Sequence, residues 1–291
     1  MDSGLLTERV VDDYALETAL GTGCTGTTWL GSFRARNGLR REVVVKLLDP
    51  TRAALHPQAD GFLRERDPRV VRYEALERAS GGRPAYTATD RASGRPWESL
   101  REETSLAQRV GVLRGLAEAL AALHAAGLVV GDLRPTNLLV RRERSGALIP
   151  LLLDVGVLPV RDPAWHDAPS RAARLFPYLA PETEAAFGPG ARLAAGPAQD
   201  VWALGATACA LLTGAAPGTL EGQLTPDAIA RGKRRKLALL CLPEPGAPLD
   251  LTRLNLVLER TLAQRPEERP SALWVADALQ ACLTRPLAAR R

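Results

Sequence analysis

Val129-Val-Gly-Asp-Leu-Arg-Pro-Thr-Asn-Leu-Leu-Val140 is the stretch of this 291-residue chain that decides its fold. The apolar ends of the stretch predict two short strands, and its polar middle predicts a tight loop between them. Asp132 and Asn137 lie five residues apart in that loop, and Pro135 stiffens the backbone between them. An ordinary polar turn can carry the same pattern, so its interpretation depends on the motifs around it.

The composition is typical of a globular protein with a sizeable core. Hydrophobic residues make up 46% of the chain and charged residues 24%, and the length suggests one large domain or two lobes that share a cleft. No apolar run approaches the ~20 residues needed to cross a bilayer, and the N-terminus lacks the pattern of a secretion signal. The four cysteines are scattered singly, which fits a reducing compartment. We therefore expect a cytoplasmic protein without a membrane segment.

The net charge of +5 comes almost entirely from arginine, because only three of the 38 cationic residues are lysines. Aromatic residues make up only 4%, so we expect no nucleic-acid partner. One of the rare lysines, Lys46, lies inside the apolar predicted strand Arg41–Leu48. A buried ammonium needs a charged partner, which a nucleotide phosphate would supply. A strand-end lysine that reaches solvent is the alternative.

A glycine-rich motif lies between two predicted strands near the N-terminus. Tyr14–Leu20 predicts the first strand, and Gly21-Thr-Gly-Cys-Thr-Gly26 follows it. Glycines at this spacing let a backbone turn tightly and approach phosphates closely. A dinucleotide-binding fold would continue with a helix, but the β-branched and aromatic Thr27–Phe33 predicts a strand, and Asn37-Gly38 predicts a hairpin turn. The pattern favours a phosphate-binding hairpin, with a plain glycine hairpin as the alternative.

The second half of the chain begins with helical periodicity from Ser105. Gly127 ends the predicted helix. Its apolar residues recur three and four positions apart, at Leu106, Val110, Leu113, Leu116, Leu120 and Leu123. Further motifs follow in chain order: Asp154-Val-Gly156 after the apolar strand Ala147–Leu153, Tyr178-Leu-Ala-Pro-Glu182, Gln199-Asp-Val-Trp-Ala-Leu-Gly205 in an apolar helix, and Arg265-Pro-Glu-Glu-Arg-Pro270 before the last predicted helix.

Together and in this order, the motifs resemble those of the protein kinase superfamily, and in particular the bacterial eukaryotic-like serine/threonine protein kinases. The opening stretch is similar to the family's catalytic loop, His-Arg-Asp-x-x-x-x-Asn. The strand of Lys46 is similar to Val-Ala-Ile-Lys, and Asp154-Val-Gly156 is similar to Asp-Phe-Gly. The resemblance extends from about Tyr14 to Leu283. It implies a bilobal α+β fold, with a β-rich N-lobe at residues 1–91 and a larger helical C-lobe at residues 92–291.

The resemblance implies ATP and Mg²⁺ as cofactors and a protein as substrate. The implied catalytic residues are Asp132, Lys46, Arg134 and Asn137. Among them, Asp132 would act as the base and Arg134 would lie near the γ-phosphate, where the family has a lysine. The implied ATP-binding residues are Leu20, Gly21, Gly23, Gly26, Thr28, Val44, Lys46 and Leu139. The implied metal ligands are Asn137 and Asp154, and the implied structural residues are Asp200, which would anchor the catalytic loop, and Glu182 paired with Arg269.

The family places a helix after the lysine strand, and a glutamate of that helix pairs with the lysine. Here Thr51–Arg66 contains Pro57 and Gly61, which are both unfavourable inside a helix, so we expect a short or distorted helix. Asp60 and Glu65 are the candidate partners of the lysine. Asp60 has a short side chain and Glu65 comes late, so the sequence leaves the partner open.

Three further departures from the family concern activity. Val130-Gly131 stands in place of His-Arg, Val155 in place of Phe, and Leu175 in place of a threonine that helps to hold the catalytic aspartate. The lysine and both aspartates of the family's active site are retained. The sequence therefore favours an ATP- and Mg²⁺-dependent serine/threonine protein kinase. It leaves open a pseudokinase that binds nucleotide or a partner protein as a scaffold or allosteric regulator.

Overall fold

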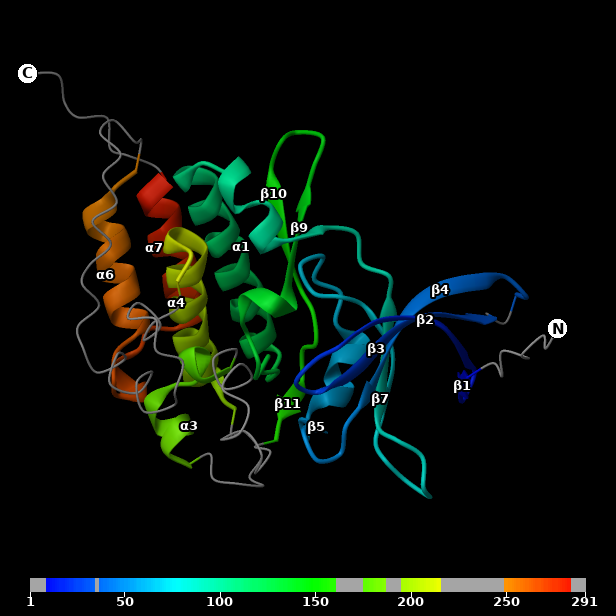
Figure 1. The fold of residues 1–291 in the computed structure, drawn as a ribbon. Coiled ribbons are helices and arrows are strands. Elements are labelled where there is room, and N and C mark those ends of the chain that lie inside the picture. The colour runs from blue at the N-terminus through cyan, green and yellow to red at the C-terminus, as the bar shows by residue number, and fades with distance from the viewer. Residues whose placement is uncertain (1–8, 35–36, 161–174, 187–194, 216–248, 284–291) are drawn as a thin grey trace, which may run out of the picture.

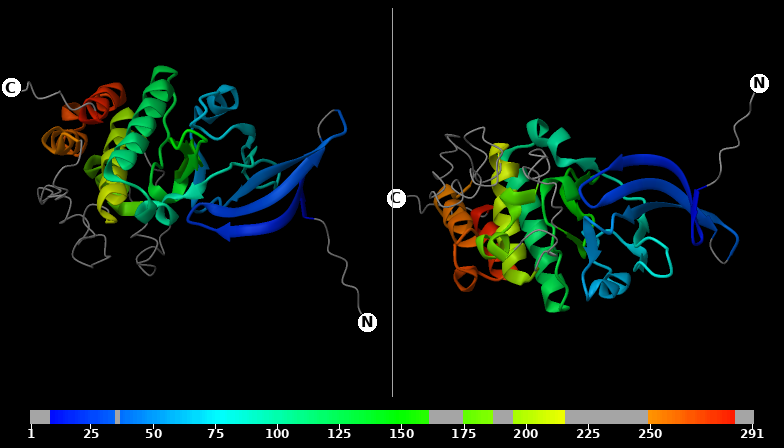
Figure 2. Two further views of the ribbon diagram at one scale, coloured as in Figure 1. Left: turned by 90° about the horizontal axis from the view of Figure 1, so that it is seen from above. Right: turned by 60° about the horizontal axis from the view of Figure 1, so that its bottom comes forward.

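The computed structural model describes residues 9–34, 37–160, 175–186, 195–215 and 249–283. Figure 1 shows a curled antiparallel sheet in blue to cyan and a group of helices in green to red. The hairpin of β9 (Leu138–Arg142) and β10 (Leu148–Leu152) lies between them. Both views in Figure 2 keep the sheet and the helices apart, which confirms the bilobal α+β fold. The resemblance also implies an activation segment at Arg161–Phe176, and only its last two residues belong to the described residues.

The N-lobe sheet has six antiparallel strands in the order β1-β2-β3-β4-β7-β6. Their bounds are Arg9–Val11 (β1), Tyr14–Thr22 (β2), Gly26–Arg34 (β3), Arg40–Leu48 (β4), Tyr73–Glu77 (β6) and Tyr86–Asp90 (β7). Val43 and Val45 of β4 are fully buried in a small core on one face of the sheet. Because side chains alternate along a strand, Val44 and Lys46 lie on the opposite face.

The segment between β4 and β6 contains no α-helix, although every residue from 49 to 72 is described. It forms the short strand β5 (Ala53–Leu55) and the 3₁₀ helix η1 (Ala59–Arg64). The expectation of a short or distorted helix is therefore confirmed, because η1 is a six-residue 3₁₀ helix. Pro57 lacks a backbone donor and Gly61 costs conformational entropy, so the segment gains little from α-helical hydrogen bonding. Instead, β5 pairs antiparallel with β11 (Val157–Pro159).

The C-lobe is built around α1, which packs against α4, α7 and β10. The helix bounds are Leu106–Ala125 (α1), Pro181–Ala186 (α3), Pro197–Thr213 (α4), Leu251–Thr261 (α6) and Ala272–Leu283 (α7). Ser105 and Gln108 form a capping box that starts α1. The predicted apolar stripe of α1 forms the centre of the core, where Leu113, Leu116 and Leu120 are fully buried. None of the helices in the described ranges combines the length and apolarity needed to span a bilayer.

Of the two strands predicted around the polar loop, only the second one forms, as β9. The stretch at Val129 and Val130 is not a strand. The N–H groups of Val130 and Gly131 each donate to the carboxylate of Asp200 at 2.9 Å, so they are not available for a strand ladder. Gly131 also has a φ of +83°, which ends an extended run. The prediction of a first strand is therefore wrong, because a contact with a distant helix takes its backbone donors.

Candidate active site

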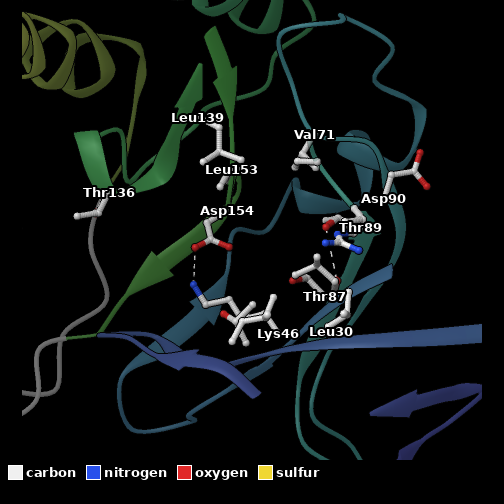
Figure 3. A pocket seen from close by; sticks show the side chains of 15 residues that line it. Leu30, Lys46, Val71, Thr87, Thr89, Asp90, Thr136, Leu139, Leu153 and Asp154 are labelled. Carbon is white, nitrogen blue, oxygen red and sulfur yellow. Dashed lines mark hydrogen bonds and ion pairs between the residues drawn. The ribbon is translucent and has the colours of Figure 1, made fainter. Parts of the chain in front are cut away.

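A pocket of about 360 Å³ lies between the N-lobe sheet and the β9–β10 hairpin. Figure 3 shows its lining residues, which come from both lobes. They are Leu20, Thr28, Leu30, Val44, Lys46, Val71, Thr87, Thr89, Asp90, Arg91, Ala92, Thr136, Leu139, Leu153 and Asp154. The volume lies within the ~300–1,000 Å³ that is usual for small-molecule sites.

Strand register explains how the sheet lines the pocket. Thr28 of β3 lies opposite Lys46 of β4, and Lys46 lies opposite Thr87 of β7. The next row, two residues along each strand, consists of Leu30, Val44 and Thr89. Residues directly opposite one another share a face of the sheet, so two rows of side chains from three strands cover one side of the pocket.

Five of the predicted ATP-binding residues line the pocket: Leu20, Thr28, Val44, Lys46 and Leu139. Sequence reasoning missed Thr87, Thr89 and Leu153, which also line it. Period-two alternation along Tyr86–Asp90 could have identified the two threonines. No comparable signal identifies Leu153, because its position depends on how the β9–β10 hairpin packs against the sheet.

The glycine motif forms the turn between β2 and β3, which a hydrogen bond from Gly23 N–H to the Gly26 carbonyl closes at 2.9 Å. A Cβ atom on Gly21 would meet no atom within 4 Å, and one on Gly23 would meet only a carbonyl oxygen at 4.0 Å. A Cβ atom on Gly26 would lie 2.0 Å from the carbonyl oxygen of Leu47. Gly21 and Gly23 therefore leave the backbone open to a ligand, whereas packing against β4 requires Gly26. Contact of these glycines with phosphate stays a prediction.

Lys46 is paired with Asp154, and its Nζ lies 2.5 Å from Oδ2 of that residue (Figure 3). The candidate partners taken from the sequence are both wrong. Asp60 pairs with Arg78 at 2.8 Å on the surface, and Glu65 accepts backbone N–H groups of the residues that follow it. With no α-helix in this segment, neither carboxylate reaches the lysine. The ammonium therefore contacts the aspartate of the Asp-Val-Gly turn directly.

Asp132 lies in a buried loop and is only 5% exposed. Its Oδ2 accepts from Nη2 of Arg134 at 2.9 Å and from Nδ2 of Asn137 at 3.1 Å. Its Oδ1 is buried and has no hydrogen-bond partner among the described residues. Burial raises the pKa of Asp132, while the charge of Arg134 opposes this effect. An unsatisfied buried carboxylate oxygen is unusual and is suited to accept a proton.

Arg134 connects the glycine motif with Asp132. It is as buried as Asp132, at 5% exposure. Besides its ion pair with Asp132, its guanidinium interacts with the thiol of Cys24, which lies in the turn between β2 and β3. The predicted position of Arg134 near a transferred phosphate is therefore compatible with its contacts, because it lies between the glycine turn and the carboxylate.

Asp200 anchors the loop that contains Asp132. Besides Val130 and Gly131, its carboxylate contacts Nε2 of His124 at 2.9 Å, and Asp200 itself is fully buried. Gly131 stands where the family has an arginine, and its backbone conformation also disfavours any larger residue. At its φ of +83°, a Cβ atom would lie 2.4 Å from Cδ2 of Leu158, so an arginine does not fit this backbone.

Glu182 and Arg269 form a bidentate ion pair, with both N–O distances at 2.7 Å. The guanidinium of Arg269 also donates to the carbonyl oxygens of Ala263, Ala198 and Gln264. It lies 5.1 Å from the ring of Trp202. The five donors of the arginine are thereby satisfied while its side chain is fully buried, and the pair ties α3 to the loop before α7.

The chain is similar to several curated serine/threonine-protein kinases of bacteria. No protein-family model matches the chain. The chain is 30% identical over 294 residues to the serine/threonine-protein kinase PkaB of Streptomyces coelicolor, an alignment that covers 96% of this chain and 65% of that protein. It is 29% identical to PkaA of the same organism, with 92% of this chain and 49% of PkaA covered.

A mycobacterial protein is similar as well. The chain is 28% identical to the serine/threonine-protein kinase PknA of Mycobacterium tuberculosis over 88% of its own length and 58% of PknA. The chain thus spans about half to two thirds of the length of these curated relatives.

Proposed function

Because this chain belongs to the protein kinase superfamily, as a relative of the bacterial eukaryotic-like serine/threonine kinases, we propose that it transfers the γ-phosphate of ATP to a serine or threonine of a protein. One observation carries the proposal. Oδ1 of Asp132 is buried and has no partner among the described residues, in a loop beside a pocket that is lined by Lys46 and Asp154. A substrate hydroxyl would supply the missing partner.

The pocket suits a nucleotide in both shape and charge. Leu20, Val44 and Leu139 provide apolar walls for a base. The ammonium of Lys46 also lines the pocket and lies 2.5 Å from Asp154. We infer that this ammonium binds the α- and β-phosphates, and that the open backbone at Gly21 and Gly23 covers them.

The residues present also fit a magnesium ion, which takes oxygen ligands and is usually held by one or two carboxylates together with substrate phosphates. Asp154 offers a carboxylate. Nδ2 of Asn137 donates to the carbonyl and the carboxylate of Asp132, which leaves the amide oxygen to act as a ligand. We assign Asp154 and Asn137 as the residues that hold the ion. When bound, it would neutralise charge on the phosphates.

Asp132 would act as the base on the acceptor. The hydroxyl oxygen forms a bond to the γ-phosphorus while the bond from phosphorus to the β,γ-bridging oxygen breaks and ADP leaves. The hydroxyl proton passes to Oδ1 of Asp132 and later to solvent. Arg134 holds the other carboxylate oxygen at 2.9 Å, which orients the base and places a cation beside the transferred phosphate.

A pseudokinase is the second candidate, and a specific observation favours it. Both cations that would bind phosphate are already paired, Lys46 with Asp154 and Arg134 with Asp132. Gly131 also lacks the side chain of the family's arginine. Such a protein would bind nucleotide or a partner protein without turnover.

The proposed function predicts that Mg-ATP raises the thermal unfolding midpoint and that labelled γ-phosphate is incorporated into a generic basic protein. Lys46→Ala is expected to weaken ATP binding by roughly 10- to 100-fold, because it removes a charged hydrogen bond to phosphate. Arg40→Ala is the control, since Arg40 lies on the same strand but its side chain is 65% exposed and pairs with Glu17. Stabilisation of the wild type without transfer would favour the pseudokinase, and the absence of both would contradict nucleotide binding.

Arg134→Gln is expected to shift the acid limb of the pH–activity profile to higher pH. The base works only when ionised, and burial raises the pKa of Asp132 while Arg134 lowers it. Removing this cation therefore raises the pKa further, so a higher pH is needed to ionise the carboxylate. Arg141→Gln on β9 is the control, because the side chain of Arg141 is 40% exposed and pairs with Glu143. An acid limb that stays in place or moves to lower pH would contradict the role of Arg134.

A further inference from the structure

The backbone after Asp154 is paired with the segment that stands in place of the α-helix. β11 and β5 form an antiparallel ladder. His56 N–H donates to the Gly156 carbonyl at 2.8 Å, and Val160 N–H donates to the Arg52 carbonyl at 2.7 Å. Main-chain hydrogen bonds from the N-lobe therefore hold both ends of β11, immediately after the Asp-Val-Gly turn.

Tyr73 of β6 adds a side-chain hydrogen bond to the same turn. Its hydroxyl donates to the carbonyl oxygen of Val155 at 3.0 Å. Tyr73 is 3% exposed and Val155 is fully buried, so water has little access to replace this bond. Burial also raises the pKa of Tyr73 well above its usual value, so the hydroxyl keeps the proton that it donates.

Phe62 of η1 completes the packing around the turn. Its ring centroid lies 6.3 Å from that of Tyr73, and it is 1% exposed. A Cβ atom on Gly156 would lie 2.9 Å from Cε2 of Phe62. Phe62 thus packs against the ring of Tyr73 and lies close to the backbone of Gly156.

We propose that Tyr73 is a positioning residue, which acts through the Val155 carbonyl to hold Asp154 in its metal-binding orientation. Asp154 has a φ of +53°, a left-handed conformation that is uncommon for a residue with a side chain and persists only where its surroundings enforce it. Without the hydroxyl, the buried Val155 carbonyl loses this donor, and the peptide group between Val155 and Gly156 is held through the Gly156 N–H, which donates to the Val130 carbonyl at 3.0 Å. A shift of this peptide group changes the backbone of Val155 and, through it, the orientation of Asp154. The inference rests on the proposed function, in which Asp154 is a metal ligand.

Tyr73→Phe tests the inference, because it removes the hydroxyl and keeps the ring that packs against Phe62. Binding of Mn²⁺ to the full chain in the presence of ADP, measured by electron paramagnetic resonance, reports on the metal site without any phosphoryl transfer. We expect the Mn²⁺ affinity of the variant to fall by roughly 10-fold, as for other residues that orient a metal ligand. The affinity for ADP alone should not change.

Tyr86→Phe is the matched control, because it also removes a tyrosine hydroxyl from the N-lobe sheet. Tyr86 is 4% exposed, and its hydroxyl donates to Oδ2 of Asp12 at 2.8 Å, away from the pocket. Both variants should have a lower thermal midpoint, but only Tyr73→Phe should bind Mn²⁺ less tightly. Equal Mn²⁺ affinity in Tyr73→Phe and wild type, or an equal loss in both variants, would overturn the inference. Failure of the wild type to bind Mn²⁺ with ADP would overturn the proposed function instead, and the inference with it.

Discussion

Asp132→Asn should lower the turnover number by roughly 10²–10⁴-fold, which is the usual contribution of a general base. The amide keeps the shape of the carboxylate but cannot accept the hydroxyl proton. Because the pocket proposed to bind the nucleotide is lined by other residues, the affinity for ATP should stay the same. Initial rates of γ-phosphate transfer and the dissociation constant of ATP, both measured on the same protein, check the two halves of the expectation.

Asp250→Asn is a suitable control for this experiment, since Asp250 is a carboxylate that caps α6 far from the pocket. The variant Asp132→Asn also leaves the buried guanidinium of Arg134 without its ionised partner, so its thermal midpoint should be compared with that of the wild type. A folded Asp132→Asn protein with unchanged turnover would show that this residue is not the base. A wild type that binds ATP but transfers no phosphate would identify a pseudokinase.

Arg269→Met should lower the free energy of unfolding by about 3 kcal/mol, at the lower end of the range for a broken buried ion pair. The lower end is expected because the side chain of Glu182 is 36% exposed and can be rehydrated, whereas the guanidinium of Arg269 is fully buried. The variant also leaves three backbone carbonyls without this donor. Denaturant-induced unfolding followed by circular dichroism measures the change.

Arg265→Met, in the same loop, is the matched control for Arg269→Met. Arg265 is 72% exposed and pairs with Glu268 at 3.3 Å, and such surface pairs contribute only about 0–1 kcal/mol. The substitution should therefore have little effect. If both variants unfold at the same denaturant concentration as the wild type, the pair of Glu182 and Arg269 does not stabilise the contact between α3 and the loop before α7.

Much of the fold could be predicted because its signals are local. The apolar run within Arg41–Leu48 predicts a strand, and the stripe from Leu106 to Leu123 predicts the buried face of α1. Glycine at positions such as Gly214, with a φ of +85° at the end of α4, marks a helix end. The same local spacing identified Asp132, Asn137 and their loop. Their catalytic roles and the lobe boundary at residue 92 stay predictions.

Local patterns failed where a distant contact decided the structure. The first predicted strand does not form because Asp200, far along the chain, takes the N–H groups of Val130 and Gly131. After β4, Ala53–Leu55 forms a strand that pairs with β11, which the sequence did not predict, and the helix is confined to η1. In both places, a tertiary hydrogen bond outweighs a local propensity that is worth only a fraction of a kcal/mol per residue.

The sequence by itself determined the set of chemical groups and their order: a lysine in an apolar strand, an aspartate and an asparagine in one loop, and an aspartate before a glycine. These follow from residue type and short-range spacing, which a single chain displays directly. Only the tertiary structure decided which groups meet. Lys46 and Asp154 are 108 residues apart in the chain and 2.5 Å apart in space, and no period or turn signal encodes a contact of that range. The same holds for Tyr73 and Val155, because packing of the two lobes brings them together.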